Sequence, residues 1–232
     1  MKKYVNLFVF VFMIGACLSQ GRAQTKSAVS YKNPVVDIAM PDPTVIKAAD
    51  GYFYVYATES TRNVPIMKSK DLVEWTYCNT AFTNKTRPRF EPKAGIWAPD
   101  INYINGKYVL YYAMSVWGGE QTCGIGVATA NSPQGPFTDH GKMFRSNEIG
   151  VQNSIDPSLL QYEGRNYLVW GSFRGIYVIE LTADGLSIMS GAKKKRIAGT
   201  AFEAVYIHKH GDYYYMFASI GSCCQGVKST YK

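Results

Sequence analysis

The sequence predicts an all-β fold made of four similar units. Each unit places a carboxylate beside a short apolar strand, which leads through a glycine turn into a strand rich in aromatic residues. The four acids are Asp42, Asp100, Asp156 and Glu203, and the four turn glycines are Gly51, Gly106, Gly164 and Gly211. Successive turn glycines are 55, 58 and 47 residues apart. Repeats of roughly 40–50 residues with several strands each are typical of a β-propeller, in which one repeat forms one blade.

The composition agrees with this fold. The chain has 232 residues with 18 Tyr and 11 Phe, and apolar residues at helical spacing are scarce. Tyr and Phe fit the pleated, half-buried surface of a sheet. The length left after a leader segment suits one sizeable domain, which we place at residues 33–232.

The first residues predict a secretory signal peptide over residues 1–23. Lys2 and Lys3 precede an apolar run from Val5 to Cys17, which is too short to span a bilayer. Cleavage after the small residues at 21–23 is the interpretation we favour, and lipid attachment through Cys17 is the alternative. We therefore expect a secreted or periplasmic protein without a membrane span, in which residues 24–32 form a linker.

The charge is mildly basic. The net charge of +8 becomes +5 without residues 1–23, because that segment carries Lys2, Lys3 and Arg22. A basic face could suit an acidic polysaccharide, but solubility is the simpler explanation. The dense basic run at residues 193–196 lies between two glycines, so we expect a solvated hairpin tip rather than a nucleic-acid site.

The strands can be placed along the chain. In the first blade they are expected over residues 44–46, 52–56, 64–69 and 70–75. A long loop should follow over residues 78–95. The second, third and fourth blades are expected over residues 96–144, 153–192 and about 200–232. The chain stops within what looks like the third strand of its fourth blade. Because open sheet edges are a liability, we expect that at least one blade is missing from this sequence.

Other common catalytic patterns do not occur. The chain has no GxSxG, HExxH or paired CxxC motif. It has three histidines, and two of them, His208 and His210, are expected at the surface rather than as ligands. The cysteines that follow Cys17 are Cys78, Cys123, Cys223 and Cys224. Four cysteines allow three pairings, and unpaired thiols are an equal alternative.

The four acids predict the chemistry. The first strand of every propeller blade lines the central channel, so acids at the same end of four such strands should converge on one axis. Crowded carboxyl groups shift each other's pKa values, so that some stay protonated while others are ionised. Glycoside hydrolysis needs such a pair, one acid to protonate the leaving oxygen and one carboxylate to activate water or attack carbon. The alternative is that the acids cap strand ends or bind a cation.

Several motifs resemble family 43 of the glycoside hydrolases, whose fold is a five-bladed β-propeller. They are Pro41-Asp42-Pro43-Thr44, Trp97-Ala98-Pro99-Asp100-Ile101, Asn153-Ser154-Ile155-Asp156-Pro157, Gly171-Ser172-Phe173, Phe202-Glu203-Ala204 and the stretch from Cys223 to Tyr231. The resemblance covers nearly all of residues 33–232. Within the family it is strongest to the endo-acting α-1,5-L-arabinanases, which the last stretch distinguishes. Family members often have Pro where Val205 stands, a change we expect to be tolerated.

The resemblance implies a role for each acid. Asp42 matches the general base that activates water, and Glu203 matches the general acid that protonates the departing oxygen. Asp156 matches the third acid, which tunes and holds the general acid. Such enzymes invert the anomeric carbon, with working carboxyls roughly 6.5–9.5 Å apart. The resemblance also implies a calcium ion, or a similar cation, on the propeller axis, with a histidine ligand that lies outside this chain.

We expect the substrate to be arabinan or a related plant cell-wall oligosaccharide, bound by a monomer. The residues expected to line the sugar site are Trp97, Asp100, Trp117, Asn153 and Ser172. The two Trp rings could stack on sugars or serve only for packing. Exo-acting α-L-arabinofuranosidase or β-xylosidase activity is an alternative on the same fold, because loop shape decides that choice. A sugar-binding propeller without catalysis is the alternative of a different class.

Overall fold

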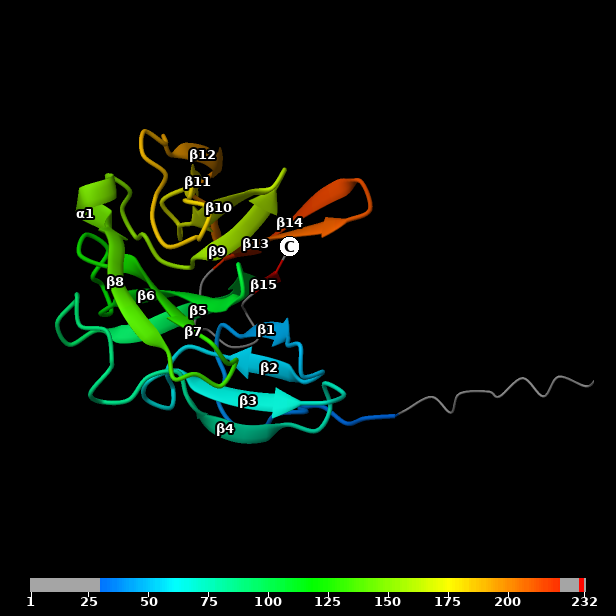
Figure 1. Ribbon diagram of the computed structural model, residues 1–232. Coiled ribbons are helices and arrows are strands. Elements are labelled where there is room, and N and C mark those ends of the chain that lie inside the picture. The colour runs from blue at the N-terminus through cyan, green and yellow to red at the C-terminus, as the bar shows by residue number, and fades with distance from the viewer. Residues whose placement is uncertain (1–29, 222–229, 232) are drawn as a thin grey trace, which may run out of the picture. The chain divides into compact units, whose positions relative to one another are not determined.

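The computed structural model describes residues 30–221 and 230–231. The description below concerns the compact unit that begins at Lys32. Its strands form four antiparallel sheets (Figure 1). The helix found among the described residues is the single turn α1 (Ser146–Ile149). The prediction of an all-β fold is confirmed.

Each sheet is built from strands that follow one another in the sequence. The first sheet has β1 (Thr44–Lys47), β2 (Phe53–Tyr56), β3 (Pro65–Ser69) and β4 (Thr76–Thr80). The second has β5 (Gly95–Ile104), β6 (Lys107–Ser115), β7 (Gly124–Ala130) and β8 (Thr138–Arg145). The third has β9 (Ser158–Tyr162), β10 (Arg165–Trp170), β11 (Ile176–Glu180) and β12 (Lys195–Ala198). The fourth has β13 (Phe202–His210), β14 (Tyr213–Ile220) and β15 (Thr230–Tyr231).

The first strands of the sheets lie next to one another. β1 contacts β5, β5 contacts β9, and β9 contacts β13. Figure 1 shows these four strands grouped in the middle, with β4, β8 and β12 toward the outside. This order fits propeller blades, whose innermost strands lie next to one another around a central channel. The four sheets therefore fit propeller blades.

One expected strand is displaced along the chain. We expected residues 70–75 to be extended, but they form a turn, and β4 begins only at Thr76. The side chain of Asp71 accepts hydrogen bonds from the backbone N–H groups of Val73 (2.9 Å) and Glu74 (2.8 Å). Such local side-chain bonds offer the backbone an alternative to the sheet, which explains the error.

The structure expected for the basic run at residues 193–196 was also partly wrong. Lys195 and Arg196 belong to β12, the outer strand of the third sheet, where they pair with Val178 and Tyr177. The expectation of a hairpin tip at residues 193–196 was therefore wrong for its second half. The expectation of solvent exposure holds, since both residues are exposed. Lysine on an edge strand discourages pairing with another chain, which gives the run a structural role.

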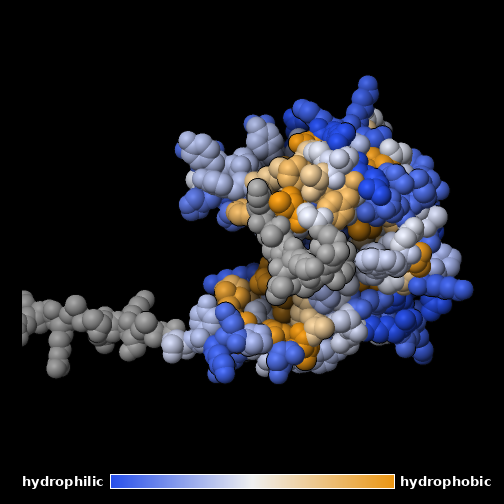
Figure 2. All heavy atoms as spheres, turned by 180° about the vertical axis from the view of Figure 1, so that it is seen from behind, coloured by the Kyte–Doolittle hydropathy of each residue, from blue (hydrophilic) through white to orange (hydrophobic). Residues whose placement is uncertain are grey.

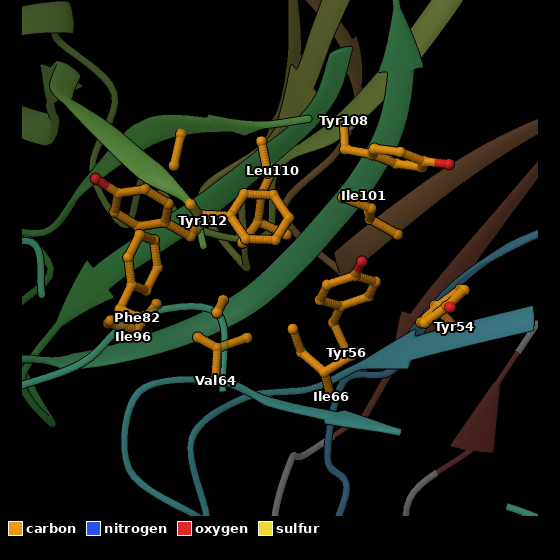
Figure 3. Packing of buried hydrophobic residues seen from close by; sticks show 14 of the residues in the cluster. Tyr54, Tyr56, Val64, Ile66, Phe82, Ile96, Ile101, Tyr108, Leu110 and Tyr112 are labelled. Carbon is orange, nitrogen blue, oxygen red and sulfur yellow. The ribbon is translucent and has the colours of Figure 1, made fainter. Parts of the chain in front are cut away.

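The core fills the space between adjacent sheets. Between the first two sheets, Tyr56 and Ile66 point toward Ile101 and Leu110 (Figure 3). A second cluster around the buried Trp170 joins the second and third sheets. Fully burying one large apolar side chain contributes about 1.5–3 kcal/mol before entropy is counted, so these clusters account for much of the fold's stability.

The fourth sheet is less covered than the others. The cluster that ties it to the third sheet has four buried members, which are Val169, Ile176, Val205 and Ala218. By contrast, the large side chains along β14 are exposed, among them Tyr213 and Phe217. On the face shown in Figure 2, hydrophobic residues gather toward the middle and hydrophilic residues form the rim.

Some predictions fall outside the described residues. They are the signal peptide at 1–23 with Cys17, most of the linker, and residues 223–229 with Cys223 and Cys224. Within the described part, Cys78 and Cys123 form no disulfide bond. The described residues also contain no helix that is long and apolar enough to cross a membrane.

Candidate active site

A cavity of about 780 Å³ opens where the first strands of the four sheets begin. Every sheet contributes to its wall, through the segments 42–45, 98–102, 156–158, 204–206 and 217–219. Asp42, Asp100 and Asp156 all border it, and Ala204 borders it directly after Glu203. The repeated position of the acids in the sequence thus becomes one shared location in space.

Asp42 and Asp156 begin their strands in the same unusual way. Each adopts a left-handed backbone, with φ of 49° and 56°, directly before a proline, and each strand starts two residues later. A non-glycine residue in this conformation is strained, and such strain concentrates at functional sites. The two repeats therefore share the same backbone conformation at this acid as well as the same Asp-Pro sequence.

The carboxylate of Asp42 is held by a hydroxyl group. Thr58 Oγ1 donates a 2.5 Å hydrogen bond to Asp42 Oδ2, and Thr58 Oγ1 accepts one of 2.7 Å from the backbone N–H of Ala98. Thr44 pairs with Tyr56 across β1 and β2, so continuing that register places Thr58 opposite Asp42. Asp42 itself is exposed to the cavity.

Asp156 is held against the start of β13. The backbone N–H of Ala204 donates to Asp156 Oδ2 at 3.2 Å. Burial, followed by the negative charges of Asp42 and Glu203, raises the pKa of Asp156 to about 8. Desolvation and like charges both disfavour the ionised form. The raised pKa therefore favours a protonated Asp156 at neutral pH.

Glu203 is the second residue of β13. Ser172 Oγ donates a 3.1 Å hydrogen bond to Glu203 Oε2, and the two residues also form a backbone bridge. Burial and the charge of Asp42 raise the pKa of Glu203, while the bond from Ser172 opposes them. The register of β13 is irregular between Glu203 and Tyr206, and Ala204 has a φ of 50°. This irregularity is what turns the Ala204 N–H toward Asp156.

Asp100 sits deeper than the other three acids. It lies inside β5, beyond a register shift, and its side chain is buried. Its carboxylate accepts hydrogen bonds from the N–H of Leu159 (2.7 Å), from Asn102 (2.7 Å) and from Thr44 (3.5 Å). Burial raises its pKa to about 6. Asp100 therefore connects three sheets through its own hydrogen bonds.

Asn153 and Ser172 form a chain of hydrogen bonds that ends at Glu203. Asn153 Nδ2 donates to the backbone oxygen of Ser172 at 3.0 Å, and Ser172 contacts Glu203 as described. Neither residue is among those that border the cavity. The structure therefore brings both predicted residues to the acid cluster, where their contacts fix the position of Glu203.

The two predicted Trp residues pack against each other. The ring centroids of Trp97 and Trp117 are 6.4 Å apart, and Trp117 is 79% exposed. Trp97 stands directly before Ala98, which borders the cavity, but neither ring is part of its wall. The pair thus forms an exposed aromatic surface next to the cavity.

Some residues of the site were not anticipated. Thr58 is one, because its place opposite Asp42 depends on the register of β1 and β2, which no residue type reveals. The aromatic side chains of Tyr206 and Phe217, which also border the cavity, are two more. Both lie on the fourth blade in alternating aromatic patterns that the sequence also shows in buried strands, so no signal distinguished them.

The predicted metal ion has no ready-made cluster of side chains. In the described ranges, no three His, Cys, Asp or Glu side chains come together as a metal site. The calcium ion that the resemblance implies therefore stays a prediction.

Comparisons with known proteins agree with this geometry. The model of Glycosyl hydrolases family 43 matches residues 31–232. An extracellular endo-α-(1→5)-L-arabinanase of Bacillus subtilis (strain 168) is 37% identical over 204 residues, which cover 82% of this chain and 62% of that protein. The chain thus spans less than two thirds of the length of this relative.

Two solved structures show the same fold. The Cellvibrio cellulosa α-L-arabinanase complexed with arabinohexaose superposes with a TM-score of 0.73 at 29% identity, over 84% of this chain and 69% of that one. An exo-1,5-α-L-arabinanase from a bovine ruminal metagenomic library gives a TM-score of 0.72 at 32% identity, over 88% and 72%. With the family model matched over most of its length, the chain belongs to family 43 of the glycosyl hydrolases.

Proposed function

We propose that the protein hydrolyses internal α-1,5-L-arabinofuranosidic bonds of arabinan by single displacement, with inversion at the anomeric carbon. The observation that carries this proposal is the acid cluster at one cavity: Asp42 and Asp156 border it, and Ala204, directly after Glu203, borders it and donates its N–H to Asp156. Burial, followed by the charges of Asp42 and Glu203, raises the pKa of Asp156 in this cluster. The B. subtilis relative is named for endo action on the same linkage, which supports the choice of substrate.

Asp42, Glu203 and Asp156 each have a different role in the proposed reaction. Asp42, exposed and held by Thr58, acts as the general base that removes a proton from the attacking water. Glu203, with its raised pKa, acts as the general acid that protonates the leaving oxygen. Asp156 holds the backbone after Glu203 through the Ala204 N–H and shares its proton with the cluster. A cluster that retains a proton near neutral pH can deliver one to the leaving group.

The sugar chain occupies the cavity above these acids. Trp97 and Trp117 offer ring faces on which sugars can stack beside it. Asn153 and Ser172 orient Glu203, and Asp100 supports the cavity floor from below. Changing Trp117 to Ala should raise KM several-fold and leave kcat nearly unchanged, whereas the exposed Tyr77 on the outer strand β4 provides a control position.

Exo action is the second candidate, because an exo-1,5-α-L-arabinanase has nearly the same TM-score as the arabinohexaose complex. Product analysis on debranched arabinan separates the two modes. Endo action gives a ladder of oligosaccharides and a rapid fall in viscosity at low conversion. Release of arabinose alone from chain ends would assign exo action instead, and binding without cleavage would assign a sugar-binding role.

The stereochemistry has its own test. Proton NMR during early turnover, before mutarotation, should show a product with the anomeric configuration opposite to that of the substrate. A first product that keeps the configuration would refute single displacement.

Three further proposals concern the setting of the protein. Secretion or periplasmic export is supported by the extracellular B. subtilis relative, with Cys17 as the alternative lipid anchor.

A calcium ion on the axis stays a prediction, as does a monomeric state. Calcium prefers oxygen ligands, so thermal unfolding with and without a chelator is the appropriate test.

A further inference from the structure

A second cavity, of about 420 Å³, lies beside the first sheet. Its walls carry the cationic side chains of Arg62, Arg87, Arg89 and Lys93. The acid among its described lining residues is Glu91, which pairs with Arg145 and accepts a 3.1 Å hydrogen bond from Thr122. Since the charge of Glu91 is already matched, the cavity has an excess of positive charge.

Neutral groups hold two of the guanidinium groups. Arg62 Nε donates to the side-chain oxygen of Asn84 at 3.0 Å, and Arg89 Nη2 donates to the backbone oxygen of Asn84 at 2.9 Å. Arg62, Arg89 and Lys93 are exposed, and none of them takes part in the ion pairs of the described residues. Two like charges held beside one neutral residue repel each other, and a bound anion would relieve that repulsion.

Arg87 forms the rigid back of this cavity. It is buried and ion-paired with Glu59, and it donates to Asn63 Oδ1 at 3.2 Å and to the backbone oxygen of Ala94 at 2.8 Å. Asn63 in turn donates to Asn84 Oδ1 at 3.2 Å. The three arginines are thus held in one hydrogen-bonded frame, so binding an anion there would require little reorganisation.

We propose that the second cavity binds the carboxylate of a uronic acid unit in an acidic polysaccharide. Planar guanidinium forks match a carboxylate through paired hydrogen bonds. Pro88, Pro92 and Met114 add apolar wall on which a sugar ring can rest, and the cavity volume falls in the range of small-molecule sites. The choice of a saccharide rests on the proposed function, while the choice of an anion rests on the cations alone.

Calorimetry with trigalacturonate tests this proposal, with neutral galactotriose as the matched ligand. The wild-type protein should bind the acidic trisaccharide and not the neutral one, and more weakly as salt is raised. The double variant Arg62→Ala/Arg89→Ala should lose about tenfold or more in affinity, because each substitution removes a charge-assisted hydrogen-bond donor. Lys85→Ala removes an exposed cation from the same loop outside the cavity, and it should leave the affinity unchanged.

Charge and geometry can be separated as well. Arg62→Lys/Arg89→Lys keeps the charge but loses the forks, so an intermediate affinity is expected. The proposal is overturned if the double alanine variant binds trigalacturonate as tightly as wild type does, or if inorganic phosphate binds more tightly at the same arginines. Cleavage of neutral arabinan, measured in parallel, should be the same in all variants, so failure of the proposed hydrolase activity is recognised independently.

Discussion

The hydroxyl group of Thr58 donates a 2.5 Å hydrogen bond to Oδ2 of Asp42 and accepts one from the backbone N–H of Ala98. One threonine from the first sheet therefore links an acid of that sheet to the first strand of the second sheet. A carboxylate that receives such a donor is held in one orientation. Thr58 is accordingly a positioning residue for the proposed general base.

Replacing Thr58 with Val should lower kcat/KM by about tenfold to a hundredfold. Val keeps the shape but removes the hydroxyl, and a hydrogen bond to a charged group contributes about 1.5–3 kcal/mol. Steady-state kinetics on arabinan measures this loss.

Two variants control this measurement. Thr58→Ser retains the hydroxyl and should restore most of the activity. Thr122→Val removes a comparable Thr–carboxylate bond, to Glu91, away from the acid cluster. If Thr122→Val lowered kcat/KM as much as Thr58→Val did, the effect would be one of general stability rather than of positioning.

Asp42 and Glu203 should respond differently to neutralisation. Asp42→Asn removes the base from every substrate, so hydrolysis should fall by about a thousandfold whatever the leaving group. Glu203→Gln should cost a similar factor on arabinan, but about tenfold or less on aryl arabinofuranosides with acidic leaving groups, which need little protonation. Comparing kcat/KM for both substrates tests the assignment. Equal losses on both substrates in both variants would contradict the division of roles.

Asp156 should make the folded state less stable as pH rises. Its pKa in the folded protein is raised from 3.8 to about 8, so between these values the folded state binds more protons than the unfolded chain. The stability contributed by this proton is fully present below about pH 4 and is lost as pH rises toward and through 8. Urea midpoints at pH 5 and pH 8 should therefore differ more for wild type than for Asp156→Asn.

The exposed Asp212, in the turn between β13 and β14, supplies the control. Asp212→Asn should show the same pH dependence of stability as wild type. An Asp156→Asn variant that also followed wild type would show that the acid cluster does not hold a proton in the folded protein.

Much of this site could be predicted because it is repeated. Asp42 and Asp156 occur in the same Asp-Pro context at the start of a strand, and Glu203 precedes its glycine turn at a comparable distance. Convergence then follows from blade geometry alone. The repeat also predicted the order of the sheets.

What the sequence could not show depends on contacts between distant segments. The partner of Asp42 is set by the register of β1 and β2, which no residue type reveals. Residues 70–75 have strand-like composition, but Asp71 binds its own backbone and delays β4 to Thr76. Asp100 resembles the other acids in sequence, yet a register shift inside β5 buries it below them.

Because Asp100 is buried below the other acids, we expect its replacement to affect the stability of the fold. Its carboxylate accepts the N–H of Leu159 from the third sheet at 2.7 Å and contacts Thr44 of the first sheet at 3.5 Å, while Asn102 binds it within the second. Asp100→Ala leaves these donors without an acceptor in a buried place. One such orphaned donor costs about 1–3 kcal/mol, so the variant should unfold at clearly lower urea concentration than wild type.

Asp100→Asn sharpens the test. The amide oxygen can still accept from Leu159, so most of the stability should return at neutral pH. Burial raises the pKa of Asp100 to about 6, so its carboxylate is ionised at a cost as pH rises from about 4 through 6, and the Asn variant should lack that decline. If Asp100→Ala were as stable as wild type, the hydrogen bonds of Asp100 would not join the sheets, and its place in the cavity floor would instead be explained by contact with the sugar.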